Sequence, residues 1–149
     1  MKYLGLDLGT KTLGLAITDA LGIIASPYKV IRYDNIDNLI DELLIIIKEE
    51  NINELVLGLP KNMNNSLGFA AERSLEFKTE LEKKCDLPIH LIDERLSTME
   101  AENILISSDT SRQKRKKIID AYAASIILDT YLKSKKGWKY GIWKNYSKK

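Results

Sequence analysis

The sequence has few of the side chains that bind soft metals or form covalent cross-links. Its 149 residues include one cysteine, Cys85, and one histidine, His90. A single cysteine excludes an internal disulfide and fits a reducing compartment. Since zinc sites use several cysteine and histidine ligands, the composition also argues against a zinc centre. We expect both residues to have packing roles.

Long apolar segments are also missing. The longest uninterrupted apolar run, residues 43–47, is far shorter than the roughly 20 residues of a membrane-spanning helix. The amino terminus leads directly into a strand pattern and lacks the apolar core and cleavage site of a signal peptide. The sequence therefore predicts a cytoplasmic protein that has no membrane partner.

The two ends of the chain carry charges of opposite sign. Residues 1–110 hold 11 Lys and Arg against 19 Asp and Glu, a net charge of −8. Residues 111–149 hold 12 against 2, a net charge of +10. A basic end on an acidic domain indicates a polyanionic partner such as nucleic acid. A solvated basic tail without a partner is the alternative interpretation.

The amino-terminal stretch predicts a β-hairpin with a carboxylate on its first strand. Residues 3–8 form an apolar run that includes Asp7, residues 9–12 are typical of a tight turn, and residues 13–18 form a second run. A carboxylate inside a core strand is costly unless a cation or hydrogen-bond donors compensate it. Asp7 is therefore either a ligand of a bound cation or a buried residue that caps a neighbouring turn.

The rest of the chain alternates between helical and strand patterns. Antiparallel strands come first and β-α units follow, which favours an α/β protein with a mixed sheet and helices on both faces. Pro27 indicates an edge strand or a bulge in the third strand. The predicted strands are residues 3–8, 13–18, 22–33, 54–59 and 89–92. The predicted helices are residues 36–50, 69–85, 97–106 and 118–132.

Three carboxylates lie among apolar residues where ligand sites are common. Asp7 is inside the first strand, Glu94 follows the last strand, and Asp120 lies on the last helix. Converging carboxylates in a chain with so little histidine and cysteine favour a hard ion, Mg²⁺ or Mn²⁺. Such a site can activate a water for phosphodiester cleavage. The pattern predicts these three residues as catalytic and metal-binding. Alternatively, Glu94 only leads a helix, and Asp120 pairs with a lysine of residues 114–117.

Four motifs occur in one order along the chain. They are Gly-Leu-Asp-Leu-Gly-Thr-Lys at 5–11, Val-Leu-Gly-Leu-Pro-Lys-Asn-Met-Asn-Asn-Ser at 56–66, Ile-Asp-Glu-Arg-Leu-Ser at 92–97 and Ile-Asp-Ala-Tyr-Ala-Ala at 119–124. Together they resemble the YqgF family, described as Holliday-junction-resolvase-like proteins and provisionally as pre-16S rRNA nucleases. The resemblance covers nearly the whole chain. Asn65 stands where the family usually has Gly, and Thr12 stands where many members have Arg.

The resemblance implies an RNase H-like fold with a five-stranded mixed sheet whose first three strands are antiparallel. It also implies divalent-metal-dependent cleavage of nucleic acid, with Asp7, Glu94 and Asp120 at the matching acidic positions. On this basis residues 1–136 form the nuclease domain, and residues 137–149 are a basic, aromatic extension. The implied activity is processing of the 5′ end of pre-16S rRNA in ribosome biogenesis, by a monomer or a homodimer.

Polar and basic residues around these motifs are candidates for holding nucleic acid. A turn with free backbone N–H groups and a lysine suits a phosphate, and a basic run binds backbone phosphates without reading sequence. For the loop residues, a purely structural role is the alternative. The predicted nucleic-acid-binding residues are Thr10, Lys11, Asn64, Ser66, Arg95, Arg112, Lys114, Arg115, Lys116 and Lys117.

Three rival functions fit the same sequence. A resolvase of branched DNA needs the same acidic site, so the sequence does not separate RNA from DNA. The first hairpin is also similar to the phosphate loop of the actin and sugar-kinase group, although that group uses two such domains and this chain has one copy. A non-catalytic nucleic-acid-binding module would keep the basic segment without needing Asp7.

Overall fold

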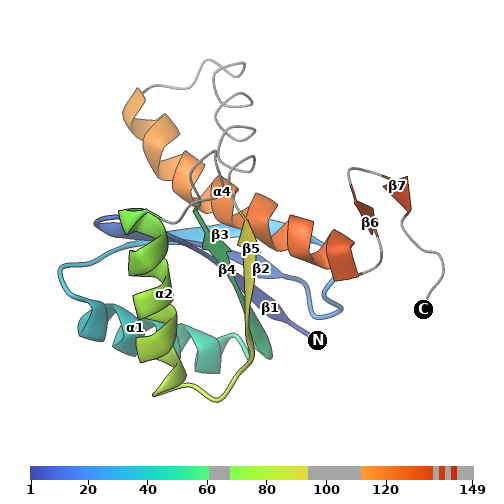
Figure 1. Cartoon of the computed structure of the whole chain (residues 1–149). Coiled ribbons are helices and arrows are strands. Elements are labelled where there is room, and N and C mark those ends of the chain that lie inside the picture. Colours follow the sequence, from blue (N-terminus) through green and yellow to red (C-terminus); the bar gives the residue numbers. More distant parts are fainter. Residues whose placement is uncertain (61–67, 94–111, 136–137, 140–141, 144–149) are drawn as a thin grey trace.

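A mixed sheet forms the centre of the fold (Figure 1). The computed structural model describes residues 1–60, 68–93, 112–135, 138–139 and 142–143, and for residues 112–119, 138–139 and 142–143 it describes the backbone alone. The strands of the sheet are β1 (Tyr3–Leu8), β2 (Thr12–Thr18), β3 (Ala25–Arg32), β4 (Glu54–Leu59) and β5 (Ile89–Asp93).

The strand order is β3-β2-β1-β4-β5. β2 pairs antiparallel with β1 and with β3, whereas β1, β4 and β5 are parallel. The predicted mixed sheet with three antiparallel strands at its beginning is therefore confirmed. β3 is an edge strand, and Pro27 lies beside a register shift in its pairing with β2, as its position in the sequence indicated.

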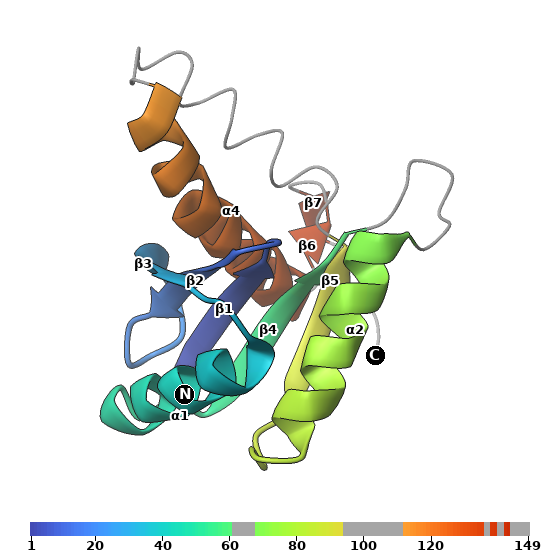
Figure 2. The ribbon, with the colours of Figure 1, turned by 90° about the vertical axis from the view of Figure 1, so that its left-hand side faces the viewer.

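Helices cover both faces of the sheet, as predicted (Figure 2). They are α1 (Ile36–Glu49), α2 (Phe69–Glu82) and α4 (Arg112–Lys135). α1 and α2 pack on one face and α4 crosses the other. Among the described residues, no helix combines the length and apolar character needed to cross a membrane. After α4, β6 (Trp138–Lys139) and β7 (Ile142–Trp143) pair antiparallel as a separate two-stranded sheet.

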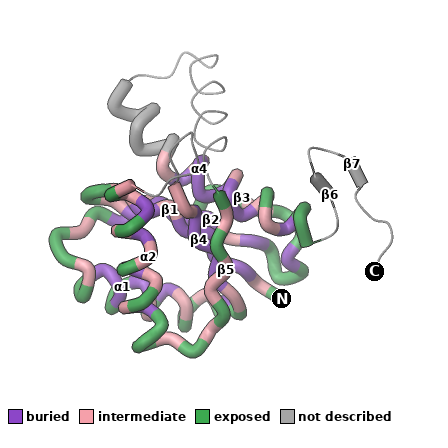
Figure 3. Tube along the Cα trace, viewed as in Figure 1, coloured by how far each residue is buried: buried purple, intermediate pink, exposed green. Residues whose placement is uncertain are grey.

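The two faces of the sheet bury different kinds of side chain. Figure 3 shows the buried residues along the strands and the helices that cover them. Leucine and isoleucine side chains from the strands and from α1, with Phe77 and Leu81 of α2, form the larger core. The core under α4 is smaller and contains Ala16 and Ala124 beside Val56. Small residues on both the helix and the sheet allow α4 to approach the strands closely.

Two glycines determine where α4 lies. A Cβ atom at Gly14 of β2 would be 2.1 Å from the backbone oxygen of Asp120. A Cβ atom at Gly5 of β1 would be 2.9 Å from the backbone oxygen of Ala124. Non-bonded atoms do not approach so closely, so neither position accepts a side chain without movement of the helix. The α4 backbone therefore rests directly on β1 and β2, with Asp120 against Gly14.

The third strand begins later than the sequence predicted, at Ala25 instead of residue 22. The residues before it form a turn in which the Asp19 carboxylate accepts hydrogen bonds from the backbone N–H groups of Ile23 and Ile24, at 2.8 and 2.9 Å. These bonds, the one from Ile24 most, lower the pKa of Asp19. The ionised Asp19 carboxylate therefore stabilises the turn. This stabilisation is lost as the pH falls through the lowered pKa of Asp19.

The last helix begins earlier than predicted. The sequence placed its start at residue 118, but α4 begins at Arg112, so the basic run forms its first turns. Lysine, arginine and glutamine are strong helix formers, but a run of them lacks the apolar stripe by which a helix is recognised in a sequence. The predicted helix at residues 97–106 lies outside the described residues.

A polar network connects the end of α4 to the first residues of the parallel strands. Lys135 Nζ donates to the Tyr3 hydroxyl at 2.6 Å, which raises the pKa of Lys135. His90 Nε2 lies 2.7 Å from Glu54 Oε1, and the His90 ring stacks on Tyr131 with ring centroids 4.7 Å apart. His90 is thus engaged within the fold, which agrees with its predicted packing role.

Replacing Ser74 with Ala is expected to stabilise the protein by about 1 kcal/mol. Ser74 is fully buried on α2, and its hydroxyl has no hydrogen-bond partner among the described residues. Alanine removes the unpaired polar atom and favours the helix. Urea unfolding measures the effect. Ser125→Ala is the control, because the Ser125 hydroxyl donates to the Tyr122 carbonyl at 2.7 Å and its loss should bring no gain. Equal gains in both variants would contradict the explanation.

Candidate functional site

The carboxyl ends of three parallel strands meet at one edge of the sheet, which we call the carboxyl edge. β1, β4 and β5 run in the same direction and end at Leu8, Leu59 and Asp93. The turn between β1 and β2 lies at the same edge because it follows Leu8 directly. Sheets with parallel strands commonly bind ligands at this edge.

Asp7 and Asp120 lie close together at the carboxyl edge. Asp7 pairs with Gly14 across the β1–β2 hairpin, and residues directly opposite in antiparallel strands point to the same face. A side chain on Gly14 would collide with Asp120, so the Asp7 side chain lies on the face that α4 covers. Both aspartates are partly buried. The structure therefore brings together two of the three predicted catalytic residues.

A threonine holds the Asp120 carboxylate. Thr12 Oγ1 donates a hydrogen bond to Asp120 Oδ2 at 2.9 Å. Thr12 lies two residues before Gly14 on β2, so both face α4. The alternative partner considered for Asp120 was a lysine of residues 114–117, whose side chains are not described.

The turn of the first hairpin carries two predicted phosphate contacts. Thr10 and Lys11 are exposed next to Asp7 on this turn. Tyr33 packs against the larger core and holds this turn through two hydrogen bonds. Its hydroxyl donates to the Gly9 carbonyl at 2.5 Å, and its backbone N–H donates to the Lys11 carbonyl at 3.0 Å. Burial raises the pKa of Tyr33, so its hydroxyl remains a donor over a wide pH range. The turn is thus rigidly placed.

The predicted basic run forms the helical turns that precede Asp120. From Asp120 back to Arg112, α4 extends about 12 Å at 1.5 Å per residue, and Figure 1 shows these turns projecting beyond the sheet. The side chains of Arg112, Lys114, Arg115, Lys116 and Lys117 are not described. The backbone alone places these residues beside the carboxyl edge.

Four predicted site residues lie outside the described part of the chain. Asn64 and Ser66 belong to the segment after β4, and Glu94 and Arg95 directly follow the last residue of β5. β5 is two strands away from β1, which corresponds to about 10 Å. The point at which the chain leaves β5 is therefore near Asp7, and the roles of these four residues stay predictions.

The donor groups at the carboxyl edge suit a hard cation. Asp7 and Asp120 provide carboxylate oxygens, whereas the single histidine is bound to Glu54 near the start of β4 and β5. Within the described ranges, no group of three His, Cys, Asp or Glu side chains is arranged to hold a metal ion. A third acidic ligand at this edge would therefore come from a segment outside these ranges.

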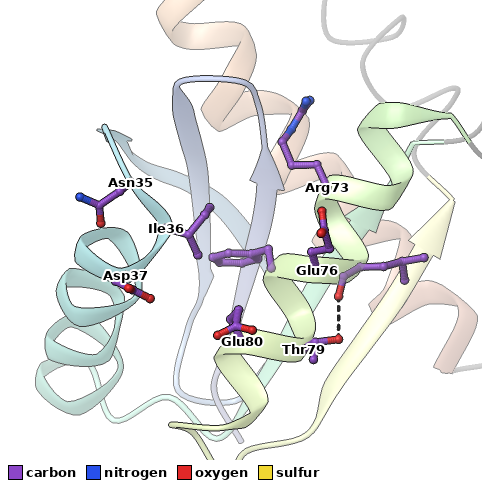
Figure 4. Close-up of a pocket in the computed structure, with 9 residues that line it drawn as sticks. Asn35, Ile36, Asp37, Arg73, Glu76, Thr79 and Glu80 are labelled. Atoms are coloured by element: carbon purple, nitrogen blue, oxygen red, sulfur yellow. Dashed lines mark hydrogen bonds between the residues drawn. The ribbon is translucent and has the colours of Figure 1, made fainter.

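A separate pocket lies on the opposite face of the sheet, between α1 and α2 (Figure 4). It has a volume of about 510 Å³, and Asp37, Glu76 and Glu80 are among its lining residues. Three carboxylates would repel the phosphates of a nucleic acid. Arg73 also lines the pocket, and its Nε atom is buried without a hydrogen-bond partner among the described residues. We therefore treat this pocket as distinct from the candidate site.

Sequence reasoning missed two residues of the site. In the sequence, Thr12 is notable only because it stands where many family members have an arginine. The strand pattern includes Tyr33 only as its last residue. The two-residue spacing of Thr12 and Gly14 is a signal that both share one face. That signal becomes informative only when the position of α4 is known. No local pattern in the sequence predicts the contact of Tyr33 with Gly9.

The fold is similar to that of a known resolvase. T. thermophilus RuvC, solved in complex with a Holliday junction substrate, matches the chain with a TM-score of 0.58. The match covers 92% of this chain and 96% of RuvC at 12% sequence identity, so it concerns the fold alone. The predicted RNase H-like fold is confirmed.

Close relatives match the chain over most of its length. A protein of Desulforamulus reducens is 47% identical over 134 residues, which cover 90% of this chain and 98% of the relative. A protein of Staphylococcus haemolyticus is 51% identical over 136 residues, which cover 89% and 96%. Both are provisionally named pre-16S rRNA nucleases, in agreement with the predicted function. The family model RuvX, described as Holliday junction resolvase, matches residues 1–134. The chain therefore belongs to the RuvX family, which is the YqgF family that its motifs predicted.

Proposed function

We propose that the protein is a metal-dependent nuclease that processes the 5′ end of pre-16S rRNA. The observation that carries the proposal is the placement of Asp7 and Asp120 on one face of the sheet at its carboxyl edge. The provisional names of its relatives supply the substrate. Because this RNA is made in the cytoplasm, the proposal places the protein there.

In the proposed centre, Asp7, Glu94 and Asp120 hold Mg²⁺ or Mn²⁺. When bound, such a cation lowers the pKa of a water molecule and stabilises negative charge on the phosphodiester. Asp7 and Asp120 approach each other from β1 and α4. Glu94 directly follows the last residue of β5, which ends at the same edge, and this position in the chain supports it as the third ligand.

The residues around the acidic centre bind and orient the nucleic acid. Thr10 and Lys11 are exposed on a rigid turn next to Asp7, where a backbone N–H, a hydroxyl and an ammonium group can contact one phosphate. Residues 112–117 lie on the helical turns beyond Asp120 and bind further phosphates without reading sequence. Asn64, Ser66 and Arg95 contact the substrate from the segments that follow β4 and β5.

The proposed organisation separates a catalytic part from an extension. Residues 1–136 form the nuclease domain, and residues 137–149 are an accessory extension that contains β6 and β7. The proposed centre uses residues of one chain, so the protein works as a monomer or as a homodimer with two independent sites.

The decisive experiment offers the full-length protein two substrates. A precursor of small-subunit rRNA and a four-way DNA junction are each incubated with Mg²⁺, with Mn²⁺ or with chelator. We expect the RNA to be shortened with either metal and to remain intact with chelator. Cleavage with chelator would contradict metal dependence. Binding without cleavage of either substrate would show a non-catalytic module.

Branched DNA is the second candidate substrate. It is favoured by the description of the family as Holliday junction resolvases and by the fold shared with RuvC. The acidic centre would serve both substrates in the same way, since it acts on the phosphodiester. Cleavage of the junction, with the RNA left intact, would replace the first proposal with this one.

A further inference from the structure

Thr12 directly holds the Asp120 carboxylate. The contact is partly buried and joins residues 108 positions apart in the sequence. A hydroxyl has one proton to donate, so it engages Oδ2 and leaves Oδ1 to act as a ligand. In contrast to a lysine or arginine, a threonine does not neutralise the carboxylate, which keeps its negative charge for a cation.

Hydrogen bonds fix the position of the backbone around Thr12. The Thr12 carbonyl accepts a hydrogen bond from the Gly9 N–H at 2.7 Å, which closes the hairpin turn. Tyr33 holds the same turn through the carbonyls of Gly9 and Lys11. The β-branched side chain of Thr12 has few rotamers. The hydroxyl therefore reaches Asp120 from a position that the fold determines.

We propose that Thr12 is a positioning residue that orients the Asp120 carboxylate for cation binding. The inference rests on the proposed function, because it requires Asp120 to be a metal ligand. Hydrogen-bond partners of metal ligands fix the orientation of the ligand, and their loss typically weakens metal binding about 10- to 100-fold. Thr12 acts through Asp120 and does not touch the substrate.

A purely structural role for the bond, to attach α4 to the sheet, is the competing explanation. The helix has other attachments that do not involve Thr12. Its backbone rests on Gly5 and Gly14, and its own side chains Ile127 and Leu128 are fully buried in the smaller core against the sheet. A protein without the Thr12 hydroxyl is therefore expected to keep its fold, so its metal affinity can be measured.

The test compares Thr12→Val with Thr12→Ser in the full-length protein. Valine keeps the shape of threonine without the hydroxyl, and serine keeps the hydroxyl. Electron paramagnetic resonance of free Mn²⁺ gives the affinity without nucleic acid. We expect Thr12→Val to weaken Mn²⁺ binding about 10- to 100-fold, with Thr12→Ser close to the unmodified protein. In cleavage assays, Thr12→Val should lower kcat and leave the KM for RNA unchanged.

Thr18→Val is the control for a loss of stability alone. The Thr18 hydroxyl accepts a hydrogen bond from the Tyr3 N–H at 2.9 Å, at the other end of β2. This variant should unfold more easily and bind Mn²⁺ normally. Unchanged Mn²⁺ binding by Thr12→Val, or equal losses in the valine and serine variants, would overturn the positioning role.

A fourth variant separates this inference from the proposed function. Asp120→Asn removes the charge of the proposed ligand itself. If it leaves Mn²⁺ affinity unchanged, the proposed metal centre is wrong. If it abolishes binding while Thr12→Val has no effect, the metal centre stands and the role of Thr12 is wrong.

Discussion

Replacement of Asp7 by Asn is expected to reduce cleavage on the order of a thousandfold, because a cation at such a centre contributes several kcal/mol to the transition state. Asparagine has nearly the shape of aspartate, so the pairing of Asp7 with Gly14 in the hairpin should persist. Nucleic-acid binding should also persist, since it depends on the basic residues. Single-turnover cleavage of precursor rRNA measures the loss, and a filter-binding assay measures the retained affinity.

Asp19→Asn is the control for this prediction. It is the same chemical change at an exposed residue of the β2–β3 turn, remote from the carboxyl edge. We expect normal cleavage by this variant at neutral pH. If Asp7→Asn cleaved at the rate of the control, Asp7 would be a structural residue and the proposed chemistry would be wrong.

Replacement of Gly14 by Ala is expected to destabilise the protein by about 3 kcal/mol or more. The new Cβ would lie 2.1 Å from the backbone oxygen of Asp120, and a backbone atom cannot move aside as a flexible side chain can. α4 must shift, and Asp120 must shift with it. Cleavage should therefore fall in the fraction of the protein that still folds. Urea unfolding and single-turnover assays measure the two effects.

Two other glycines give a graded comparison. A Cβ at Gly5 would meet Ala124 O and Leu128 Cβ at 2.9 Å, so Gly5→Ala should be less harmful than Gly14→Ala. At Gly9 the nearest atoms are 3.3 Å away, and the cost in stability should be smallest. A different order of stabilities, or a Gly14→Ala protein as stable as the original, would contradict the close packing of α4 on the hairpin.

Most of the fold could be predicted because local patterns agree with the final packing. Residues 3–8 and 54–59 are predominantly apolar, each with one acidic residue, and both form strands in the centre of the sheet. The first helix was predicted at residues 36–50 from its sequence pattern, and in the structure Asn35 accepts a hydrogen bond from the Asn38 N–H and caps α1. In each case the interactions that decide the structure are formed within a few residues.

The site could be predicted only in part, because its geometry depends on contacts between distant segments. The apolar residues on either side of Asp7 and Asp120 marked each aspartate as unusual. The two lie close together only because Gly14 allows the α4 backbone to approach β2. The bond from Thr12 to Asp120 depends on the same packing. Glu94 was inferred from the family motif and from its place after a strand, and it stays a prediction.

The late position of α4 in the chain has a consequence for synthesis on the ribosome. β1, β2 and β3 are adjacent in sequence and can pair as soon as they emerge, whereas α4 is translated after all five strands of the sheet. Until then a nascent chain leaves the face around Ala16 and Val56 uncovered and open to chaperones. It also lacks Asp120, so under the proposed mechanism a copy of the protein that is still being synthesised would not cleave RNA.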